Sequence, residues 1–152
     1  METFDSYVLF ALIVLPLIGA GLLMAIPGRH QVAVRWTATL FASVALVLSS
    51  YIFLFYYLDH RDEGGMQFTR TWDWLELPGA GPLAERGITL ALGVDGIAAP
   101  MVLLTGIVMF CGVLMSWTVK DRSKDFFILY FVLLSGVFGV FASLDMFFFF
   151  FF

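Results

Sequence analysis

The sequence predicts an all-α integral membrane protein with four transmembrane helices, the start of a fifth helix, and a long outward-facing loop. Of its 152 residues, 61% are hydrophobic and 13% are charged, whereas soluble domains are about half apolar and about a quarter charged. The mean hydropathy is +0.96. A small soluble domain leaves much of its surface in water and cannot hide this apolar excess. The composition therefore argues against a soluble enzyme and against a disordered tail.

The charged residues leave four long segments without any charge, at residues 7–26, 36–58, 96–119 and 126–144. A helix of about 20 residues spans roughly 30 Å, the thickness of the bilayer core. Backbone groups in lipid must hydrogen-bond within the segment, which favours helices. We therefore expect four transmembrane helices. Buried helices of a soluble protein are a weaker interpretation, because none of the four segments has a polar face.

The first segment, 7–26, is expected to be a retained helix. Glu2 and Asp5 make the preceding residues acidic, whereas a cleaved signal peptide begins with a basic region and has a shorter apolar core. Pro27 and Gly28 form a helix-stop pair after this segment.

Small residues recur at helical spacing in the other three segments and allow neighbouring helices to approach closely. They are Ala38, Ala42, Ala45 and Ser49 in the second segment, Gly112 and Ser116 in the third, and Ser135 and Gly139 in the fourth. We expect these faces to form helix–helix contacts.

The long loop, residues 59–95, holds ten of the charges. Trp72 and Trp74 among acidic residues predict an interfacial segment, followed by a turn at Pro78 and the glycines after it. Residues 88–92 (ITLAL) have side chains compatible with a β-strand. They fit either a short strand or an extended entry to the third helix.

A fifth apolar run begins at residue 146, and only Ser143, Leu144 and Asp145 separate it from the fourth. We expect the two runs to form a tight antiparallel pair. The seven residues of the fifth run would cover about 10 Å as a helix, roughly a third of the hydrocarbon thickness. Because a terminal carboxylate within lipid is costly, we expect the sequence to be the front end of a longer protein.

Basic residues near helix ends indicate the cytoplasmic side of a membrane protein. Arg29 and Arg35 lie in the first connection, and Lys120, Arg122 and Lys124 lie in the third. The residues before the first segment and the fourth connection carry none. This bias predicts that the N-terminus and the long loop face outward.

No Asp, Glu, Lys, Arg or His lies within the four charge-free segments. These helices therefore cannot relay protons through titrating side chains. We find no catalytic, cofactor-binding or metal-ligating set: Cys111 lies in mid-span, and His30 and His60 lie in separate connections. The net charge of −4 gives no case for nucleic-acid binding.

Two carboxylates stand at the starts of predicted helices. Asp95, followed by Gly96, precedes the third helix, and Asp145 precedes the fifth. Aspartate is a preferred helix N-cap, so a capping role is favoured for both. An ion-entry or subunit-contact role for Asp95, and a proton-access role for Asp145, are the functional alternatives.

These motifs carry a family resemblance. Residues 92–97 (LGVDGI) and 102–105 (VLLT) resemble the signature that enters the third helix of the antiporter-like membrane subunits of respiratory complex I. Residues 72–74 (WDW) fit the same outer loop, and residues 138–146 (FGVFASLDM) resemble the turn between the family's fourth and fifth helices. The resemblance covers the whole chain, and among these subunits it is strongest to the subunit M (NuoM) type of NADH-quinone oxidoreductase.

The resemblance implies a membrane subunit of the proton-translocating NADH:quinone oxidoreductase, a multi-pass protein of the bacterial inner (plasma) membrane. It implies the lipid bilayer and the other membrane subunits of complex I as partners. NADH, FMN, iron–sulfur clusters and quinone are then bound by partner subunits, and no cofactor is bound by this chain.

The family's functional glutamate in the fifth helix and its mid-membrane lysines are expected after Phe152, so no proton-relay residue is carried over. Asp95, Gly96 and Asp145 match family motifs and are assigned structural or assembly roles. Two alternatives remain: a subunit of an Mrp-type cation/proton antiporter or membrane-bound hydrogenase, and a non-catalytic membrane scaffold.

Overall fold

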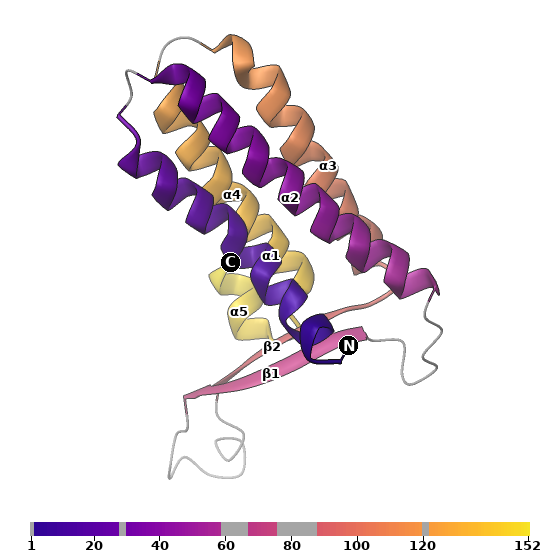
Figure 1. Ribbon diagram of the computed structural model, residues 1–152. Coiled ribbons are helices and arrows are strands. Elements are labelled where there is room, and N and C mark those ends of the chain that lie inside the picture. The colour runs from indigo at the N-terminus through magenta and orange to yellow at the C-terminus, as the bar shows by residue number, and fades with distance from the viewer. Residues whose placement is uncertain (1, 28–29, 59–66, 76–87, 120–121) are drawn as a thin grey trace, which may run out of the picture.

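The computed structural model describes residues 2–27, 30–58, 67–75, 88–119 and 122–152. In these residues four long helices form a bundle, a two-stranded sheet crosses one end of it, and a short fifth helix lies beside it (Figure 1). The elements are α1 (Glu2–Ala25), α2 (Gln31–Leu58), β1 (Gln67–Leu75), β2 (Ile88–Val94), α3 (Ala98–Met115), the 3₁₀ turn η1 (Ser116–Thr118), α4 (Ser123–Ala142) and α5 (Met146–Phe151).

The four long helices confirm the predicted fold class. Four stretches are long and apolar enough to cross a membrane: Tyr7–Ala25 in α1, Gln31–Leu58 in α2, Ala98–Thr118 in α3 with η1, and Ser123–Ala142 in α4. Helix α2 has 28 residues and is about 42 Å long at the usual helical rise. It therefore exceeds the hydrocarbon thickness, and its terminal turns reach the headgroup regions. The chain is therefore a membrane protein.

Three helices start earlier than the charge-free segments indicated. Helix α1 begins at Glu2, α2 at Gln31 and α4 at Ser123. Arg35 and Lys124 therefore lie in the opening turns of helices and not in connections. The physical reason is that a helix does not end where the hydrocarbon ends. Charged residues are tolerated in terminal turns because their long side chains reach the polar interface.

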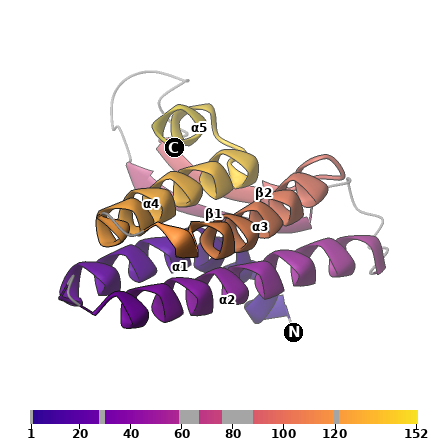
Figure 2. The ribbon, with the colours of Figure 1, turned by 90° about the horizontal axis from the view of Figure 1, so that it is seen from above.

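Neighbouring helices run antiparallel, with α1 packed chiefly on α4 and α2 chiefly on α3 (Figure 2). The predicted small-residue face of α2 is confirmed, because Ala38, Ala42, Ala45 and Ser49 are all fully buried. A side chain at Gly106 of α3 would collide with the Ser49 hydroxyl. Small residues therefore let α2 and α3 approach closely.

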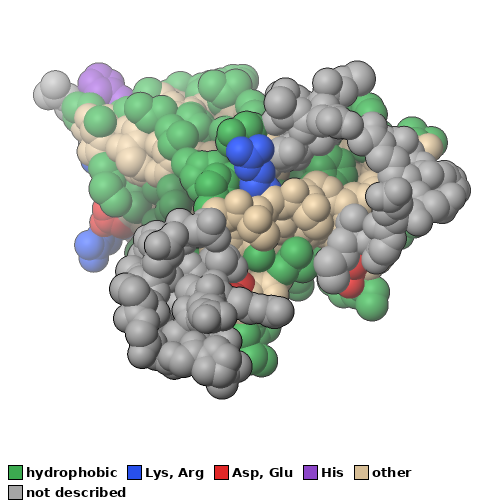
Figure 3. Space-filling view, turned by 90° about the horizontal axis from the view of Figure 1, so that it is seen from below, with side chains coloured by type: hydrophobic (Ala, Val, Ile, Leu, Met, Phe, Trp, Pro, Cys, Tyr) green, Lys and Arg blue, Asp and Glu red, His purple; other side chains and the backbone are tan. Residues whose placement is uncertain are grey.

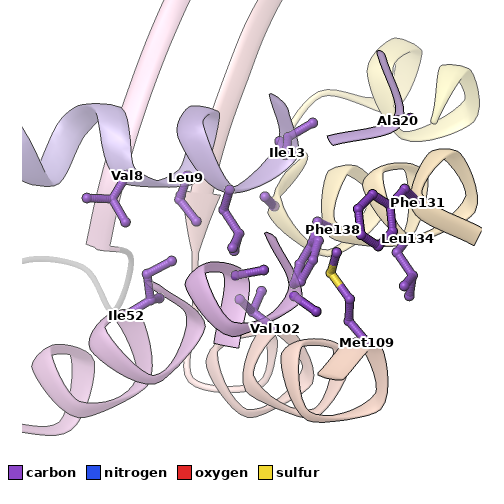
Figure 4. Close-up of a cluster of buried hydrophobic side chains, with 14 of the residues drawn as sticks. Val8, Leu9, Ile13, Ala20, Ile52, Val102, Met109, Phe131, Leu134 and Phe138 are labelled. Atoms are coloured by element: carbon purple, nitrogen blue, oxygen red, sulfur yellow. The ribbon is translucent and has the colours of Figure 1, made fainter. Parts of the chain in front are cut away.

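The core lies where the four helices meet, and α1, α2, α3 and α4 all contribute to it (Figure 4). Its largest fully buried side chains include Phe127, Phe131 and Phe138 of α4. The outer surface is apolar as well: Leu40, Val47, Leu104 and Leu129 are each more than half exposed. Figure 3 shows hydrophobic side chains among the described residues of the face it views. Helices that are apolar on all sides match a lipid environment.

The two strands form an antiparallel hairpin at one end of the bundle. Arg70 pairs with Leu92 and Trp72 with Leu90. The short strand considered for residues 88–92 is confirmed as part of β2. Trp72 and Trp74 both lie in β1, a strand that the sequence analysis did not predict. Alternating Thr and aromatic residues favour a pleated strand. The acidic residues around them had favoured a loop in the sequence analysis.

The register is irregular near the start of β1, where Phe68 adopts a positive φ of 57°. This backbone conformation is uncommon for an aromatic residue and is typical of a bulge. The turn predicted at Pro78, together with His60 and Lys120, lies outside the described residues.

Helix α5 folds back against α4 on the outside of the bundle (Figure 2). The connection is Ser143–Asp145, as expected. A side chain at Gly139 of α4 would collide with the Phe152 ring. The predicted tight antiparallel pair is therefore present, and glycine makes the close approach possible.

Candidate functional sites at the two ends of the helix bundle

Asp95 caps the start of α3. Its Oδ1 accepts hydrogen bonds from the backbone N–H of Ile97 at 3.1 Å and of Ala98 at 2.6 Å. Its carbonyl oxygen accepts the Ala99 N–H at 3.0 Å, which is the first i to i−4 bond of the helix. These bonds satisfy donors that a helix N-terminus otherwise leaves without partners.

Asp145 occupies the equivalent position before α5. Its Oδ1 accepts the N–H of Phe147 at 2.7 Å and of Phe148 at 3.4 Å. Its carbonyl accepts the Phe149 N–H at 2.9 Å and the Ser143 hydroxyl at 3.0 Å. Both carboxylates therefore stabilise helix starts at the same end of the bundle.

Gly96 lies where the end of α2 meets the start of α3. A Cβ at this position would stand 3.3 Å from the Tyr56 hydroxyl oxygen. The Tyr57 hydroxyl donates to the Gly96 carbonyl at 3.4 Å. A larger residue would press against Tyr56, so Gly96 serves close packing in this structure.

Strand β2 ties this end of the bundle together. The Leu144 N–H donates to the Ala91 carbonyl at 2.9 Å, and Leu92 forms an isolated bridge with Ser143. A side chain at Gly93 would collide with Leu144. The strand that leads into Asp95 thus pairs with the connection that leads into Asp145, and Figure 1 shows both at the sheet end.

Arg70 of β1 attaches the hairpin to α1. Its Nη2 donates to the Tyr7 hydroxyl at 2.9 Å, and its guanidinium carbon lies 4.3 Å from the centroid of the Tyr7 ring and 5.4 Å from that of Trp72. Trp72 also contacts Phe10 at 5.5 Å between ring centroids. Sequence reasoning counted Arg70 only as a loop charge, since nothing local in the sequence relates it to Tyr7.

The opposite end is held by cations. Lys124 Nζ donates to the carbonyls of Met24 and Ile26, each at 2.8 Å. Arg35 Nη2 donates to the Val119 carbonyl at 3.1 Å, just after η1. These carbonyls belong to helix C-termini, which lack intrahelical donors and carry partial negative charge. Sequence reasoning used both cations only to assign sidedness.

An aromatic contact supports the same end. Trp117 Nε1 donates to the Thr39 hydroxyl at 3.1 Å, and the rings of Trp36 and Trp117 meet edge to face at 5.6 Å. The 3₁₀ turn after α3 is therefore fixed to the first turns of α2.

The bundle interior contains hydroxyls but no titrating group among the described residues. The buried polar side chains there are Ser49, Thr105, Ser123 and Ser135. Ser49 and Thr105 donate to carbonyls of their own helices, at 3.0 and 2.8 Å. No group of three or more His, Cys, Asp or Glu that could hold a metal ion occurs in the described part of the chain. Cys111 is exposed on the outer face of α3.

The sequence is similar to known proteins over most of its length. No protein-family model matches the chain. It is 34% identical over 139 residues to NAD(P)H-quinone oxidoreductase chain 4, chloroplastic, of Chara vulgaris, covering 91% of this chain and 26% of that protein. It is 33% identical over 138 residues to NAD(P)H-quinone oxidoreductase chain 4 2 of Thermosynechococcus vestitus, covering 91% and 24%.

A third relative is NAD(P)H-quinone oxidoreductase chain 4-2 of Synechocystis sp., which is 31% identical over 138 residues, covering 91% of this chain and 23% of that protein. The chain thus spans about a quarter of the length of the curated relatives it matches. Over nine-tenths of its own length, the chain is similar to NAD(P)H-quinone oxidoreductase chain 4 proteins.

Proposed function

We propose that this chain is the front part of an antiporter-like membrane subunit, of the subunit M (NuoM) type, in a proton-translocating NADH:quinone oxidoreductase. The observation that carries the proposal is the combination of four membrane-length apolar helices with similarity to chain 4 proteins over 91% of the chain. The chain acts as part of an enzyme complex and performs no redox chemistry of its own.

In this proposal the four helices form a packed wall beside a proton route. Moving one charge against about 100 mV requires about 2.3 kcal/mol, and the sites that do so must titrate. The buried polar side chains of the described residues are hydroxyls. The titrating residues are therefore supplied by the rest of the subunit, and these helices exclude water and lipid from them.

The same proposal assigns the electron carriers to other polypeptides. NADH, FMN, iron–sulfur clusters and quinone bind to partner subunits, and the outer faces of this bundle meet lipid and the neighbouring membrane subunits. The apolar outer surface supports this assignment, because it suits both hydrocarbon and other apolar helices.

We further propose a bacterial inner membrane location with the N-terminus and the hairpin facing outward. The basic end, with Arg35, Arg122 and Lys124, then lies in the cytoplasm. Single cysteines placed in a Cys111→Ala background test this. T71C in β1 should react with a membrane-impermeant maleimide in intact spheroplasts, and H30C should react only after permeabilisation; both positions are exposed. The reverse labelling pattern would refute the orientation.

The function is tested in inverted membrane vesicles from cells that lack the full-length gene. Loss of both NADH-driven quinone reduction and proton uptake, with recovery on complementation, is the expected result. An Mrp-type antiporter would leave NADH oxidation intact and lose sodium-stimulated proton exchange. A dispensable scaffold would leave both activities and the assembled complex on native gels unchanged. Either of these two results would overturn the proposal.

A further inference from the structure

Helix α1 carries a proline in its interior, at Pro16, and the helix continues on both sides of it. Proline lacks a backbone N–H, so the Leu12 carbonyl, four residues earlier, has no intrahelical donor. The pyrrolidine ring also presses on the carbonyl of that preceding turn. Helix α1 is therefore weakest at this turn, within the stretch assigned to the membrane.

Helix α4 places a hydroxyl at the same turn. Ser135 Oγ donates to the carbonyl of Ile13 at 2.7 Å, and the bond is buried. Ser135 itself is only 3% exposed. Within a membrane, the backbone groups freed by a proline are satisfied by neighbouring helices, often through Ser or Thr side chains. The Ser135 bond does not reach the Leu12 carbonyl; it goes to the next carbonyl, that of Ile13, and so adds an interhelical hydrogen bond within the weakened turn.

This use of a hydroxyl differs from that of the comparable buried residues. Ser49 donates to Leu46 and Thr105 to Met101, each within its own helix. The Ser135 hydroxyl instead crosses from α4 to α1. Figure 4 shows Ile13 of α1 in the same buried cluster as Leu134 and Phe138 of α4.

The two halves of α1 are attached to different parts of the molecule. After Pro16, a side chain at Gly19 would collide with Phe131, and Lys124 holds the carbonyls of Met24 and Ile26. This half is therefore packed closely on α4 and bonded to it at its end.

The half before Pro16 carries Tyr7, and through Arg70 it carries the hairpin. The Ser135–Ile13 bond is the polar link between this half and α4 at the level of the proline. Breaking that bond would leave this half held by its apolar packing and by the hairpin, which is bonded to Leu144 after α4, and bending at Pro16 would become easier.

We propose that Pro16 is a flexible joint in α1 and that Ser135 is the latch that holds the joint in the observed conformation. The missing N–H at Pro16 lowers the resistance of the helix to bending, and the Ser135 hydroxyl opposes bending through its interhelical bond to Ile13 in the same turn. The proposal does not depend on the function proposed above, since it follows from the α1–α4 contacts alone.

The test measures the distance between spin labels on both sides of the joint. Ala11→Cys and Ala25→Cys place labels on exposed positions of α1, about 21 Å apart along a straight helix, in full-length protein with Cys111→Ala. S135A should broaden the distance distribution and raise the opening equilibrium about threefold, the usual size for an interhelical hydrogen bond in a membrane. P16A combined with S135A should restore the narrow distribution, because an alanine in place of the proline supplies the missing N–H.

S49A is the matched control, since it also removes a buried serine hydroxyl, and it should leave the distribution narrow. S135T keeps the hydroxyl donor, so its distance distribution should also stay narrow. If S135A alone fails to fold, P16A/S135A should recover folding. The proposal would be overturned if S135A broadened the distance distribution equally with and without Pro16, or did not broaden it at all. It would also be overturned if P16A did not restore folding to an S135A protein that fails to fold.

Discussion

The two ends of the bundle are closed by charges of opposite sign. At the sheet end, Asp95 and Asp145 accept hydrogen bonds from the first N–H groups of α3 and α5. At the other end, Lys124 and Arg35 donate to the last carbonyls of α1 and to the residue after η1. Each charge complements the partial charge of the helix end that it contacts.

The comparison shows that one charge can serve two physical purposes. Basic residues at one end of a helix bundle are ordinarily taken as markers of the cytoplasmic side. Here Arg35 and Lys124 also satisfy carbonyls that would otherwise lack donors. Counting charges does not separate these purposes, whereas substitutions that keep charge and change hydrogen bonding do.

The largest effect is expected from Lys124→Met, which keeps the length of the side chain and removes its donors. The carbonyls of Met24 and Ile26 would lose their partner, with a destabilisation of about 1 to 2 kcal/mol after allowance for partial exposure. Denaturant titration in mixed micelles measures it. K124R retains the cation and should lose less than half as much. A K124M protein as stable as the original would show that the cation marks the cytoplasmic side and does not stabilise the end of α1.

At the sheet end, Asp95→Ala removes the acceptor for Ile97 and Ala98 and should destabilise the protein by about 1 kcal/mol. D95N keeps a capping oxygen without the charge, so it should retain most of the stability. Quinone reductase activity of the complex proposed above should follow stability in both variants. Loss of activity in a stable D95N protein would instead assign Asp95 an ion-entry role.

The attachment of the hairpin should be weaker than the caps. Arg70→Gln removes the contacts with the Tyr7 and Trp72 rings and should cost about 0.5 to 1 kcal/mol. Hydrogen exchange of the β1 amides measures it, with faster exchange expected in R70Q. Y7F keeps the ring beneath the guanidinium and removes the acceptor, so its effect should be smaller. Equal rates of β1 amide exchange in the original protein and R70Q would mean that β2 alone attaches the hairpin to the bundle.

The smallest effect is expected from Arg122→Gln at the basic end. Its ion pair with Asp125 has an N···O distance of 3.1 Å, but the side chains are 87% and 54% exposed. Water screens such a pair, so the change in unfolding free energy should be about 0.3 kcal/mol or less. The same titration used for K124M provides the measurement. A loss comparable with that of K124M would contradict the view that backbone capping, and not charge as such, stabilises this end.

Several features of the site could be anticipated because they depend on neighbours in sequence. Asp95 and Asp145 stand directly before apolar helices, and an aspartate there can reach the first N–H groups whatever surrounds it. The small face of α2 was equally visible, because helical spacing places Ala38, Ala42 and Ala45 on one side. Of the hairpin, a strand was considered only for residues within β2 and not for β1, since strand formation depends on the partner strand as well as on a segment's own residues.

The membrane-length helices could be predicted from the amino-acid sequence alone, because burial of apolar surface in lipid depends on composition and length and on no particular neighbour. The pairing of polar groups could be learned only from the folded chain: Lys124 meets the end of α1, Arg70 meets Tyr7, and Ser135 meets the turn before Pro16. Those partners are 63 to 122 residues apart in sequence. Hydrogen bonds act over about 3 Å, so their pairing exists only once the chain has folded.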